Sequence, residues 1–389
     1  MCPWAAVRSV NGDVTGAQSW DRAWLAAILR ADPELPPAPA GFLPEQALAA
    51  AVRERVVALV STRLAVRPPG ASTPSAEVLS LFSSTSRSLM AQSMFRDWEC
   101  RQIIHCLGKS SLSSLVLKGA ALAHTLYDEP HLRQTGDIDL LLGMRSDVES
   151  AAAALAGIGY SSDIEAVPGN LVGFELLCLK DIKQGFGWEV DLHWRLSNTP
   201  LFADAFCWKE LLEESKPLSA LGPGARSLGA VHAFFHACLH RATNLQFGDG
   251  DQLGWLYDIH LLARGLDESA WHRVLSLASA RGLAGVCLHA LQAARREFGN
   301  AGDEWLLDRL DATARREWLR PERMHSWLYT QWATFRSLPT AHSRMRWVRQ
   351  RLFPSGRHLR KMHGRREEGL AWITVRRFRS ALDRITRPR

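Results

Sequence analysis

The stretch Leu115–Leu142 constrains the fold more than any other, because it predicts two buried strands around a short helix. Its apolar start stops at Lys118-Gly119, which is typical of a strand that ends in a tight turn. Residues 120–127 are rich in Ala and Leu, which favours a helix. After a polar loop, residues 137–142 predict the second strand, and an Ala-rich helix is expected to follow it.

Two carboxylates, Asp137 and Asp139, open the second predicted strand. Because side chains alternate faces along a strand, both lie on one face, about 6.5 to 7 Å apart. Unneutralised carboxylates this close repel each other and lose hydration beside an apolar strand, whereas divalent cations would stabilise them. Such groups can bridge a metal pair about 3.5 to 4 Å apart, the spacing used in phosphoryl transfer. The pattern predicts a metal site, and a solvated strand end is the alternative that it leaves open.

A third carboxylate follows on a predicted hairpin. Residues 174–179 and 188–194 have the pattern of two paired strands. In the second of these strands Asp191 alternates with apolar residues, as the first two carboxylates do, and Glu189 and His193 flank it on the same face. Asp191 is therefore the candidate that completes a carboxylate triad.

Three histidines follow one another at helical spacing in residues 231–241. His232, His236 and His240 are four residues apart, so they lie within about 80° of arc on one helix face. Such a stripe can bind a metal ion or line a cleft. Neither a cysteine nor a carboxylate completes a ligand set nearby in the sequence, so buried histidines with a packing role are the alternative.

Most of the remaining chain is predicted to be helical. The spacing of apolar residues predicts one uninterrupted helix over 44–64, a long helix over 75–106, and a helix over 269–298 that breaks near Gly282. The core face expected for the long helix consists of Phe82, Leu89, Met94, Phe95, Trp98 and Ile103.

The composition is that of a globular protein, with 47% hydrophobic and 22% charged residues. No apolar run approaches the ~18 residues that a membrane span requires. The first residues lack the basic and apolar regions of a signal peptide. The seven cysteines are scattered and form no Cys-x-x-Cys, which argues against a disulfide framework or a zinc knuckle. We therefore expect a cytoplasmic protein without a membrane span.

The basic residues gather at the C-terminal end. The net charge is +7, yet residues 320–389 alone hold 18 Arg or Lys against 4 Asp or Glu. Two basic amphipathic helices are expected there, at 342–353 and 370–385. Their basic faces could bind nucleic acid, an anionic membrane or an acidic partner, and a solvated face with a docked apolar side is the alternative.

Several motifs in a fixed order carry a family resemblance. They are LKG-A-x-L at Lys118-Gly119, R-x-x-x-DIDLLL from Arg133, a helix that ends in Gly159-Tyr160, the DLHW strand from Asp191, and a His-containing helix before WLYDIHLL. In this order the chain resembles the uncharacterised nucleotidyltransferase family of the DNA polymerase β-like superfamily. The likeness covers about residues 86–262 and extends more loosely to the end.

The resemblance implies an α+β fold. The expected core is a small mixed sheet with flanking helices, wrapped by further helical segments at both ends. We divide the chain into an N-terminal helical segment at 1–85, the nucleotidyltransferase core at 86–200, a helical domain at 201–319 and a basic helical segment at 320–389.

The resemblance also implies roles for individual residues. Asp137 and Asp139 would hold two Mg²⁺ ions, with Mn²⁺ as the alternative, and Asp191 would bind the catalytic ion and help to deprotonate an acceptor hydroxyl. That hydroxyl would attack the α-phosphorus of a nucleoside triphosphate, and pyrophosphate would leave. The acceptor would belong to a small molecule, a peptide or a protein.

Further residues would bind the nucleotide or line the cleft. The turn at Lys118-Gly119 would contact phosphates, together with Arg133. His193, His236 and His240 are candidates for lining the cleft.

One departure from the superfamily pattern keeps other functions open. The superfamily usually has Gly-Ser at the turn that holds Lys118-Gly119 here, and the serine hydroxyl normally contacts the triphosphate. A non-catalytic module that binds a nucleotide or a partner is therefore one alternative, and a nucleic-acid-binding protein that uses its basic C-terminal segment is another.

Overall fold

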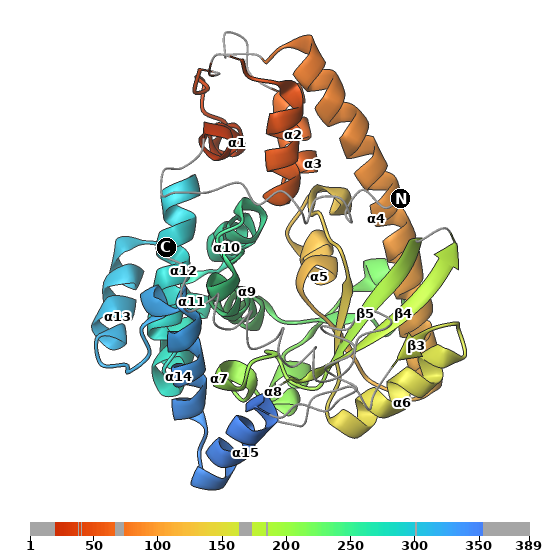
Figure 1. Cartoon of the computed structure of the whole chain (residues 1–389), viewed down its shortest axis with the longest axis vertical. Helices are drawn as coiled ribbons and strands as arrows, with labels where there is room; N and C mark the ends of the chain where they lie inside the picture. Colours follow the sequence, from red (N-terminus) through yellow and green to blue (C-terminus); the bar gives the residue numbers. More distant parts are fainter. Residues whose placement is uncertain are drawn as a thin grey trace.

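In the part of the chain that the structure describes, seven strands form one mixed sheet with the order β3-β4-β5-β2-β1-β7-β6. The computed structural model describes residues 20–37, 39, 41–66, 74–162, 173–183, 186–299 and 302–352. In chain order the strands are β1 Leu115–Val116, β2 Ile138–Leu141, β3 Ser161–Ser162, β4 Glu175–Lys183, β5 Phe186–His193, β6 Lys216–Pro217 and β7 Arg226–Ser227. Helices flank this sheet, which confirms the predicted α+β class (Figure 1).

The two faces of strand β2 meet different helices. Ile138 and Leu140 pack with the C-terminal half of α4 (Ala76–Lys109) and with α6 (Arg145–Ala156). Leu141 faces the opposite side, where it shares a core with α9 (Ala230–Asn244). Because residues alternate along the strand, Asp139 lies on the same side as Leu141. The apolar neighbours on both faces explain why this strand is buried along its whole length.

The predicted β4–β5 hairpin is confirmed. Its strands pair antiparallel, with Leu177 opposite Asp191. Strand β5 then pairs in parallel with β2 on its other edge. This pairing places the polar face of the hairpin next to the carboxylates at the start of β2.

The helices after the sheet form a second layer with its own large core. This layer contains α10 (Leu253–Gly265), α11 (Glu268–Arg281) and α12 (Ala284–Phe298), which pack with α9. The predicted break near Gly282 is confirmed, because Gly282 has a φ of +65° and ends α11. The remaining helices of this side are α7 Pro200–Ala203, α8 Trp208–Glu213, α13 Glu304–Ala314, α14 Trp327–Ser337 and α15 Ala341–Leu352.

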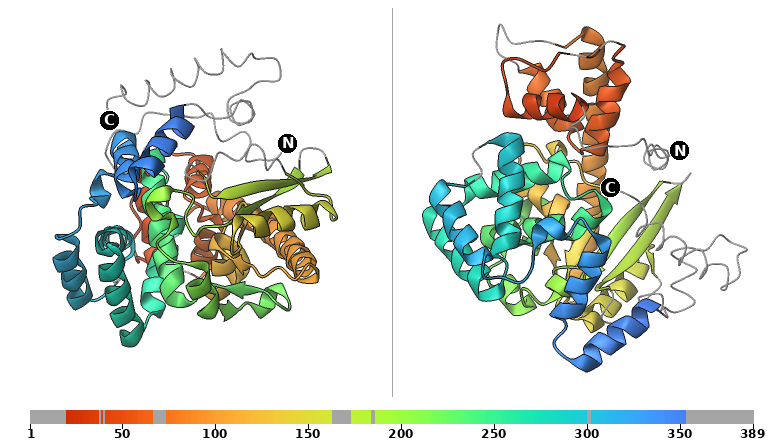
Figure 2. Two further views of the ribbon diagram at one scale, coloured as in Figure 1. Left: turned by 90° about the horizontal axis from the view of Figure 1, so that it is seen from below. Right: turned by 60° about the vertical axis from the view of Figure 1, so that its left-hand side comes forward.

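The N-terminal helices form a third core. Helices α1 (Trp20–Arg30), α2 (Pro44–Arg53) and α3 (Val57–Ala65) pack with the start of α4, and Leu253 of α10 joins them. They lie at one end of the molecule, away from the sheet (Figure 2).

The single helix predicted over 44–64 is wrong. It breaks between α2 and α3, where Arg55 has a φ of +59°. The cause is a tertiary contact: the backbone N–H of Gly254 donates to the Glu54 carbonyl at 2.9 Å, and that of Leu253 donates to the Glu54 carboxylate at 2.7 Å. These bonds satisfy N–H groups at the start of α10 that have no partner within the helix.

The long helix α4 runs across the predicted boundary at residue 85, so the division into four segments stays a prediction. The helix itself is confirmed, but three of its expected core residues are exposed and Leu89 is only half-buried. Met94, Phe95 and Trp98 are exposed, because the middle of α4 spans between the N-terminal helices and the sheet (Figure 1). Phe82 and Ile103, towards either end, are buried as expected.

The first of the two basic C-terminal helices corresponds to α15, and the second, at 370–385, lies outside the described residues. Among the helices that the structure describes, none has both the length and the apolar character needed to cross a membrane.

Candidate active site

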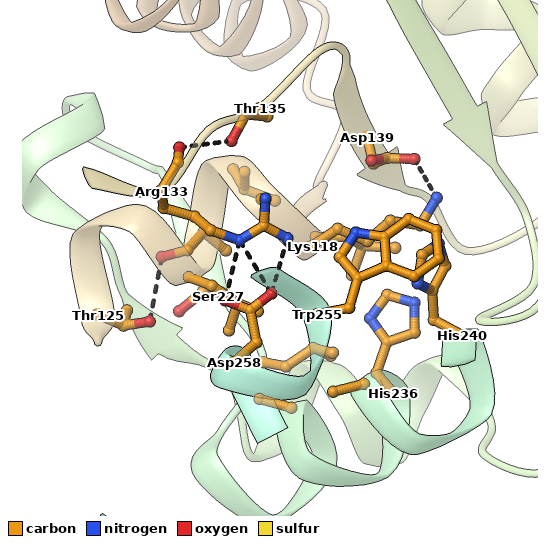
Figure 3. A pocket seen from close by; sticks show the side chains of 18 of the residues that line it. Lys118, Thr125, Arg133, Thr135, Asp139, Ser227, His236, His240, Trp255 and Asp258 are labelled. Atoms are coloured by element: carbon orange, nitrogen blue, oxygen red, sulfur yellow. Dashed lines mark hydrogen bonds and ion pairs between the residues drawn. The ribbon is translucent and has the colours of Figure 1, made fainter. Parts of the chain in front are cut away.

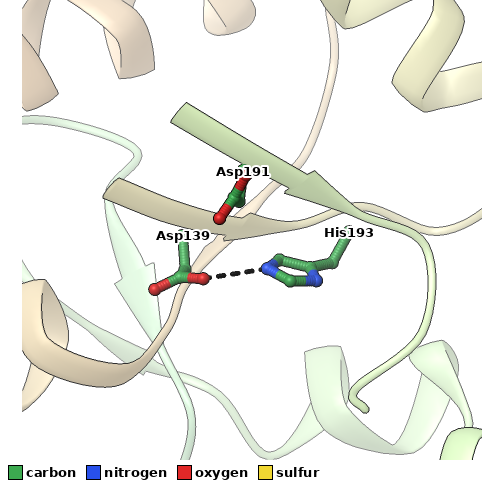
Figure 4. Close-up of side chains that lie close together, drawn as sticks. All are labelled: Asp139, Asp191 and His193. Carbon is green, nitrogen blue, oxygen red and sulfur yellow. Dashed lines mark hydrogen bonds and ion pairs between the residues drawn. The ribbon is translucent and has the colours of Figure 1, made fainter. Parts of the chain in front are cut away.

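The parallel pairing of β2 with β5 decides which acidic side chains meet. Asp139 pairs with Asp191, and Leu141 pairs with His193. Since residues two apart share a face of a strand, Asp191 and His193 both lie on the side of Asp139. The ligand atoms of the three residues all lie within 4.8 Å of one another (Figure 4). We call Asp139, Asp191 and His193 the carboxylate cluster.

Asp139 is the charged centre of this cluster. It is fully buried, its Oδ1 accepts a hydrogen bond from the Lys118 ammonium at 2.5 Å, and the same oxygen lies 2.9 Å from Nε2 of His193. Burial by itself would raise the pKa of Asp139, but the charge of Lys118 and the hydrogen bond with His193 hold that pKa far below its ordinary value. Asp139 therefore stays ionised at neutral pH.

Lys118 reaches Asp139 from the β1–α5 turn, where it is the first residue of α5 (Lys118–Thr125). It has a φ of +47°, a conformation that costs a residue with a side chain about 1 to 2 kcal/mol. The next residue must be glycine, because a Cβ on Gly119 would lie 2.6 Å from Oγ1 of Thr135. Burial would lower the pKa of Lys118, but the charge of Asp139 and the hydrogen bond to it raise that pKa above its ordinary value, so Lys118 is a cation.

Two further carboxylates resist ionisation beside Asp139. Burial, followed by the charge of Asp139, raises the pKa of Asp191 to about 7. The charge of Asp139, followed by burial, raises the pKa of Asp137, which precedes β2. These oxygen donors fit a divalent cation, because such an ion would remove the repulsion that raises both pKa values. The clustered set differs from the predicted triad, since His193 belongs to it in place of Asp137.

A cavity opens beside Asp137 and Asp139, and helices from distant parts of the chain close it (Figure 3). The β1–α5 turn forms one wall and helices α9 and α10 form another. The polar and aromatic residues of its lining are Arg55, Lys118, Thr125, Arg133, Thr135, Asp137, Asp139, Ser227, His236, His240, Trp255 and Asp258.

The comparison with known families covers this whole arrangement. Residues 41–299 match a family described as uncharacterised nucleotidyltransferase. The chain belongs to this nucleotidyltransferase family. The match extends from the N-terminal helices to α12, so it contains both strands of the carboxylate cluster and every helix that lines the cavity. No curated protein matches the sequence.

Arg133 has a protein partner within the cavity wall. Its Nε and Nη2 donate to the Asp258 carboxylate at 2.9 and 2.7 Å, and its Nη1 donates to the carbonyl of Gln134. Tyr127 donates a third hydrogen bond to Asp258 at 2.7 Å. Arg133 therefore ties the loop before β2 to α10. The contact of Arg133 with the nucleotide stays a prediction. The charge of this guanidinium is already matched by the Asp258 carboxylate.

The predicted histidines separate into two groups. His236 and His240 line the cavity, whereas His193 lies in the carboxylate cluster. Burial, followed by the charge of Lys118, lowers the pKa of His236 to about 3 and that of His240 well below its ordinary value, so both rings are neutral. The ring of His240 packs edge-on against Trp255, with the centroids 4.4 Å apart. The third member of the stripe, His232, lies 3.2 Å from the Glu210 carboxylate, away from the cavity.

Sequence reasoning missed three residues of the cavity wall. Trp255 and Asp258 belong to the WLYDIHLL motif, where they lie three residues apart on a predicted helix, and this spacing reveals no role for either side chain. Arg55 was placed inside a continuous helix, and neither a glycine nor a proline marks the break at that point. No local signal in the sequence identifies these three residues.

Proposed function

We propose that this protein transfers a nucleoside monophosphate from a nucleoside triphosphate to a hydroxyl acceptor. The observation that carries the proposal is the register of β2 and β5, which sets Asp191 beside Asp139, and Asp139 lines a cavity that also contains three cations. Membership of a nucleotidyltransferase family supports the same reaction class. The acceptor we propose is a small molecule, a peptide or a protein.

Asp137, Asp139 and Asp191 would hold the divalent cations, with Mg²⁺ as the first choice and Mn²⁺ as the second. When bound, such ions neutralise phosphate oxygens and favour the ionised form of an attacking hydroxyl. His193 keeps Asp139 oriented through the contact at Nε2. Asp191 would also receive the proton that the acceptor loses.

The charges of the cavity wall support an anionic substrate that enters together with cations. Three cations, Arg55, Lys118 and Arg133, lie among the lining residues with three carboxylates, Asp137, Asp139 and Asp258. The neutral His236 and His240 leave this balance unchanged. Divalent cations would therefore give the cavity an excess of positive charge, and a triphosphate would neutralise it.

Binding comes first in the test, because it needs no acceptor. Isothermal titration of the purified protein with each of the four common nucleoside triphosphates should give binding that depends on Mg²⁺ or Mn²⁺. Asp139→Asn should remove this binding, and Asp181→Asn, an exposed aspartate on β4, should leave it unchanged. Binding that needs no metal and survives Asp139→Asn would contradict the site.

Transfer is then measured with triphosphates labelled at the α-phosphate. Incubation with extracts fractionated into small molecules, peptides and proteins should move label to one fraction and release pyrophosphate. Pyrophosphate release of equal rate in the wild type and in Asp139→Asn would exclude catalysis at this site.

One contact favours a second candidate, a nucleotide-binding module without catalysis. The ammonium of Lys118 already occupies the position of a cation at Oδ1 of Asp139. A protein of this kind would bind triphosphates, yet it would release no pyrophosphate with any acceptor fraction. The two measurements above therefore separate the two candidates.

A further inference from the structure

The N-terminal helices contribute one residue, Arg55, to the cavity beside the carboxylates. This residue forms the corner between α2 and α3, and its φ of +59° lies in the left-handed region. The corner is fixed against α10 by the two hydrogen bonds to Glu54 and by Arg22, which donates to the Glu54 carboxylate at 2.7 Å. A Cβ on Gly254 would lie 3.0 Å from the Arg55 carbonyl, so glycine is what allows this close approach.

Arg55 differs from the other two cations of the wall. Lys118 is paired with Asp139, and Arg133 is paired with Asp258. Within the described part of the chain no carboxylate forms an ion pair with Arg55, although Asp137 and Asp139 are among the acids whose charges act on it. Burial, followed by the charge of Arg133, lowers the pKa of Arg55 from its ordinary value, as expected for a cation that lacks a partner.

The guanidinium of Arg55 is oriented by Trp255. Its central carbon lies 5.5 Å from the centroid of the Trp255 ring. The Arg55 guanidinium forms no ion pair within the described residues, so its N–H groups are available to a ligand. The edge of a guanidinium has the geometry that matches two oxygens of one phosphate.

The backbone conformation supports the same conclusion. Glycine would adopt the corner without strain, and asparagine nearly so, yet the chain has arginine. Residues held in sparsely populated backbone conformations cluster at active sites and at ligand-binding positions.

We propose that Arg55 binds the phosphate groups of the nucleotide, so that the N-terminal helices complete the nucleotide site of the sheet. This inference rests on the proposed function. The phosphates would lie between Arg55 and the cations held by Asp137 and Asp139, because the carboxylates and the guanidinium line the same cavity. The unpaired charge of Arg55 then gains a partner when the nucleotide binds.

The test uses Arg55→Asn in the full-length protein, with inorganic tripolyphosphate and nucleoside triphosphates as probes in the presence of Mg²⁺. Tripolyphosphate has no base, so it reports the phosphate contact alone. The dissociation constants for both probes should rise about tenfold or more, the effect of losing a hydrogen bond to a charged group. The Tm should stay at or above that of the wild type, because asparagine tolerates the left-handed region.

The matched control is Arg53→Asn, two residues earlier at the end of α2, where the arginine is exposed. Its dissociation constants should equal those of the wild type. Arg55→Lys should retain part of the affinity, because the charge remains although the planar fork is lost.

Each other outcome is decisive. If Arg55→Asn binds both probes as the wild type does while Asp139→Asn binds neither, the inference about Arg55 is wrong and the proposed function stands. If Arg55→Asn loses Tm and affinity together and the uncharged Arg55→Met restores both, Arg55 serves the packing of the corner and the inference is again wrong. If the wild type binds neither probe with Mg²⁺ or Mn²⁺, the proposed function fails and the inference fails with it.

Discussion

The β1–α5 turn and the α2–α3 corner each hold one cation at the cavity, and they differ in what that cation contacts. Each places a cation in the left-handed region, Lys118 at a φ of +47° and Arg55 at +59°, and each directs that cation to one cavity. Lys118 forms an ion pair with Asp139, whereas Arg55 lies over the ring of Trp255 and has no ion pair in the part of the chain that the structure describes. A paired cation stabilises the protein without a ligand, and an unpaired one is available to a ligand.

Substitution of Asp139, the ion-pair partner of Lys118, should have the largest effect on transfer. Asp139→Asn removes a cation ligand and leaves Lys118 without its carboxylate. We expect transfer of α-phosphate label to fall by about 1,000-fold or more, as for the loss of a group that the reaction needs directly. The transfer rate is compared with that of Asp181→Asn. A loss of less than tenfold would show that the Asp139 carboxylate contributes less to the reaction than the β1–α5 turn does.

A second substitution, Asp191→Asn, tests how much of the negative charge of the carboxylate cluster Lys118 neutralises. The pKa of Asp191 is about 7 in the folded protein and about 3.9 in an unfolded chain. Between these values the folded state holds a proton that the unfolded state has released, so a rise in pH through this window destabilises the fold, by up to about 4 kcal/mol above it. Asp191→Asn should therefore stabilise the metal-free protein at about pH 8 and leave it nearly unchanged at about pH 4.

Urea unfolding in EDTA at the two pH values measures this difference. The same variant should lose nucleotide transfer, so stability and activity move in opposite directions. Equal stabilisation at both pH values would mean that Lys118 neutralises the whole cluster.

A matched pair of substitutions compares the two cations directly. Lys118→Met leaves the buried Asp139 without its main counter-charge and should cost about 3 kcal/mol of unfolding free energy. Arg55→Met leaves no carboxylate unpaired and should cost less than about 1 kcal/mol. Because both residues have positive φ, the backbone contribution is the same in each variant. Equal losses in urea unfolding would remove the distinction between a paired and an unpaired cation.

A smaller effect than that of Lys118→Met is expected at Gly254, the glycine that admits the α2–α3 corner. Gly254→Ala would bring a Cβ to 3.0 Å from the Arg55 carbonyl and 3.1 Å from that of Glu54. We expect a loss of about 1 to 3 kcal/mol as the corner moves away, together with weaker tripolyphosphate binding. Gly265→Ala is the control, since a Cβ there meets no atom within 4 Å. Tripolyphosphate affinity that stays unchanged while stability falls would separate the corner from the nucleotide.

The part of the site that can be predicted from the sequence is the placement of its carboxylates along two strands. The alternation of Asp137, Ile138 and Asp139 and the hairpin that carries Asp191 follow from the two-residue period of a strand, which is a local property. The register that places Asp191 and His193 beside Asp139 is not local, because it depends on how two strands pair across some 50 residues of chain.

The opposite side of the cavity could not be predicted, since its contacts join distant segments. Arg133 was assigned to the nucleotide from the resemblance and from its charge, and its partner Asp258 lies 125 residues further along the chain. The break at Arg55 is imposed by the start of α10, against a helical pattern that continues through it. The spacing of apolar residues identifies one face of a helix, which is why we expected Met94, Phe95 and Trp98 in the core. The spacing does not show where the segment that packs against this face ends.

The hydrogen bonds that hold Glu54 to the start of α10 link the attachment of the N-terminal helices to what the cavity contains. If a phosphate recruits Arg55, every gain in that contact also strengthens the seating of α1, α2 and α3, since free energies of linked equilibria act reciprocally. A saturated protein would then release these helices less readily than an empty one, and their protection from proteases would rise with nucleotide concentration.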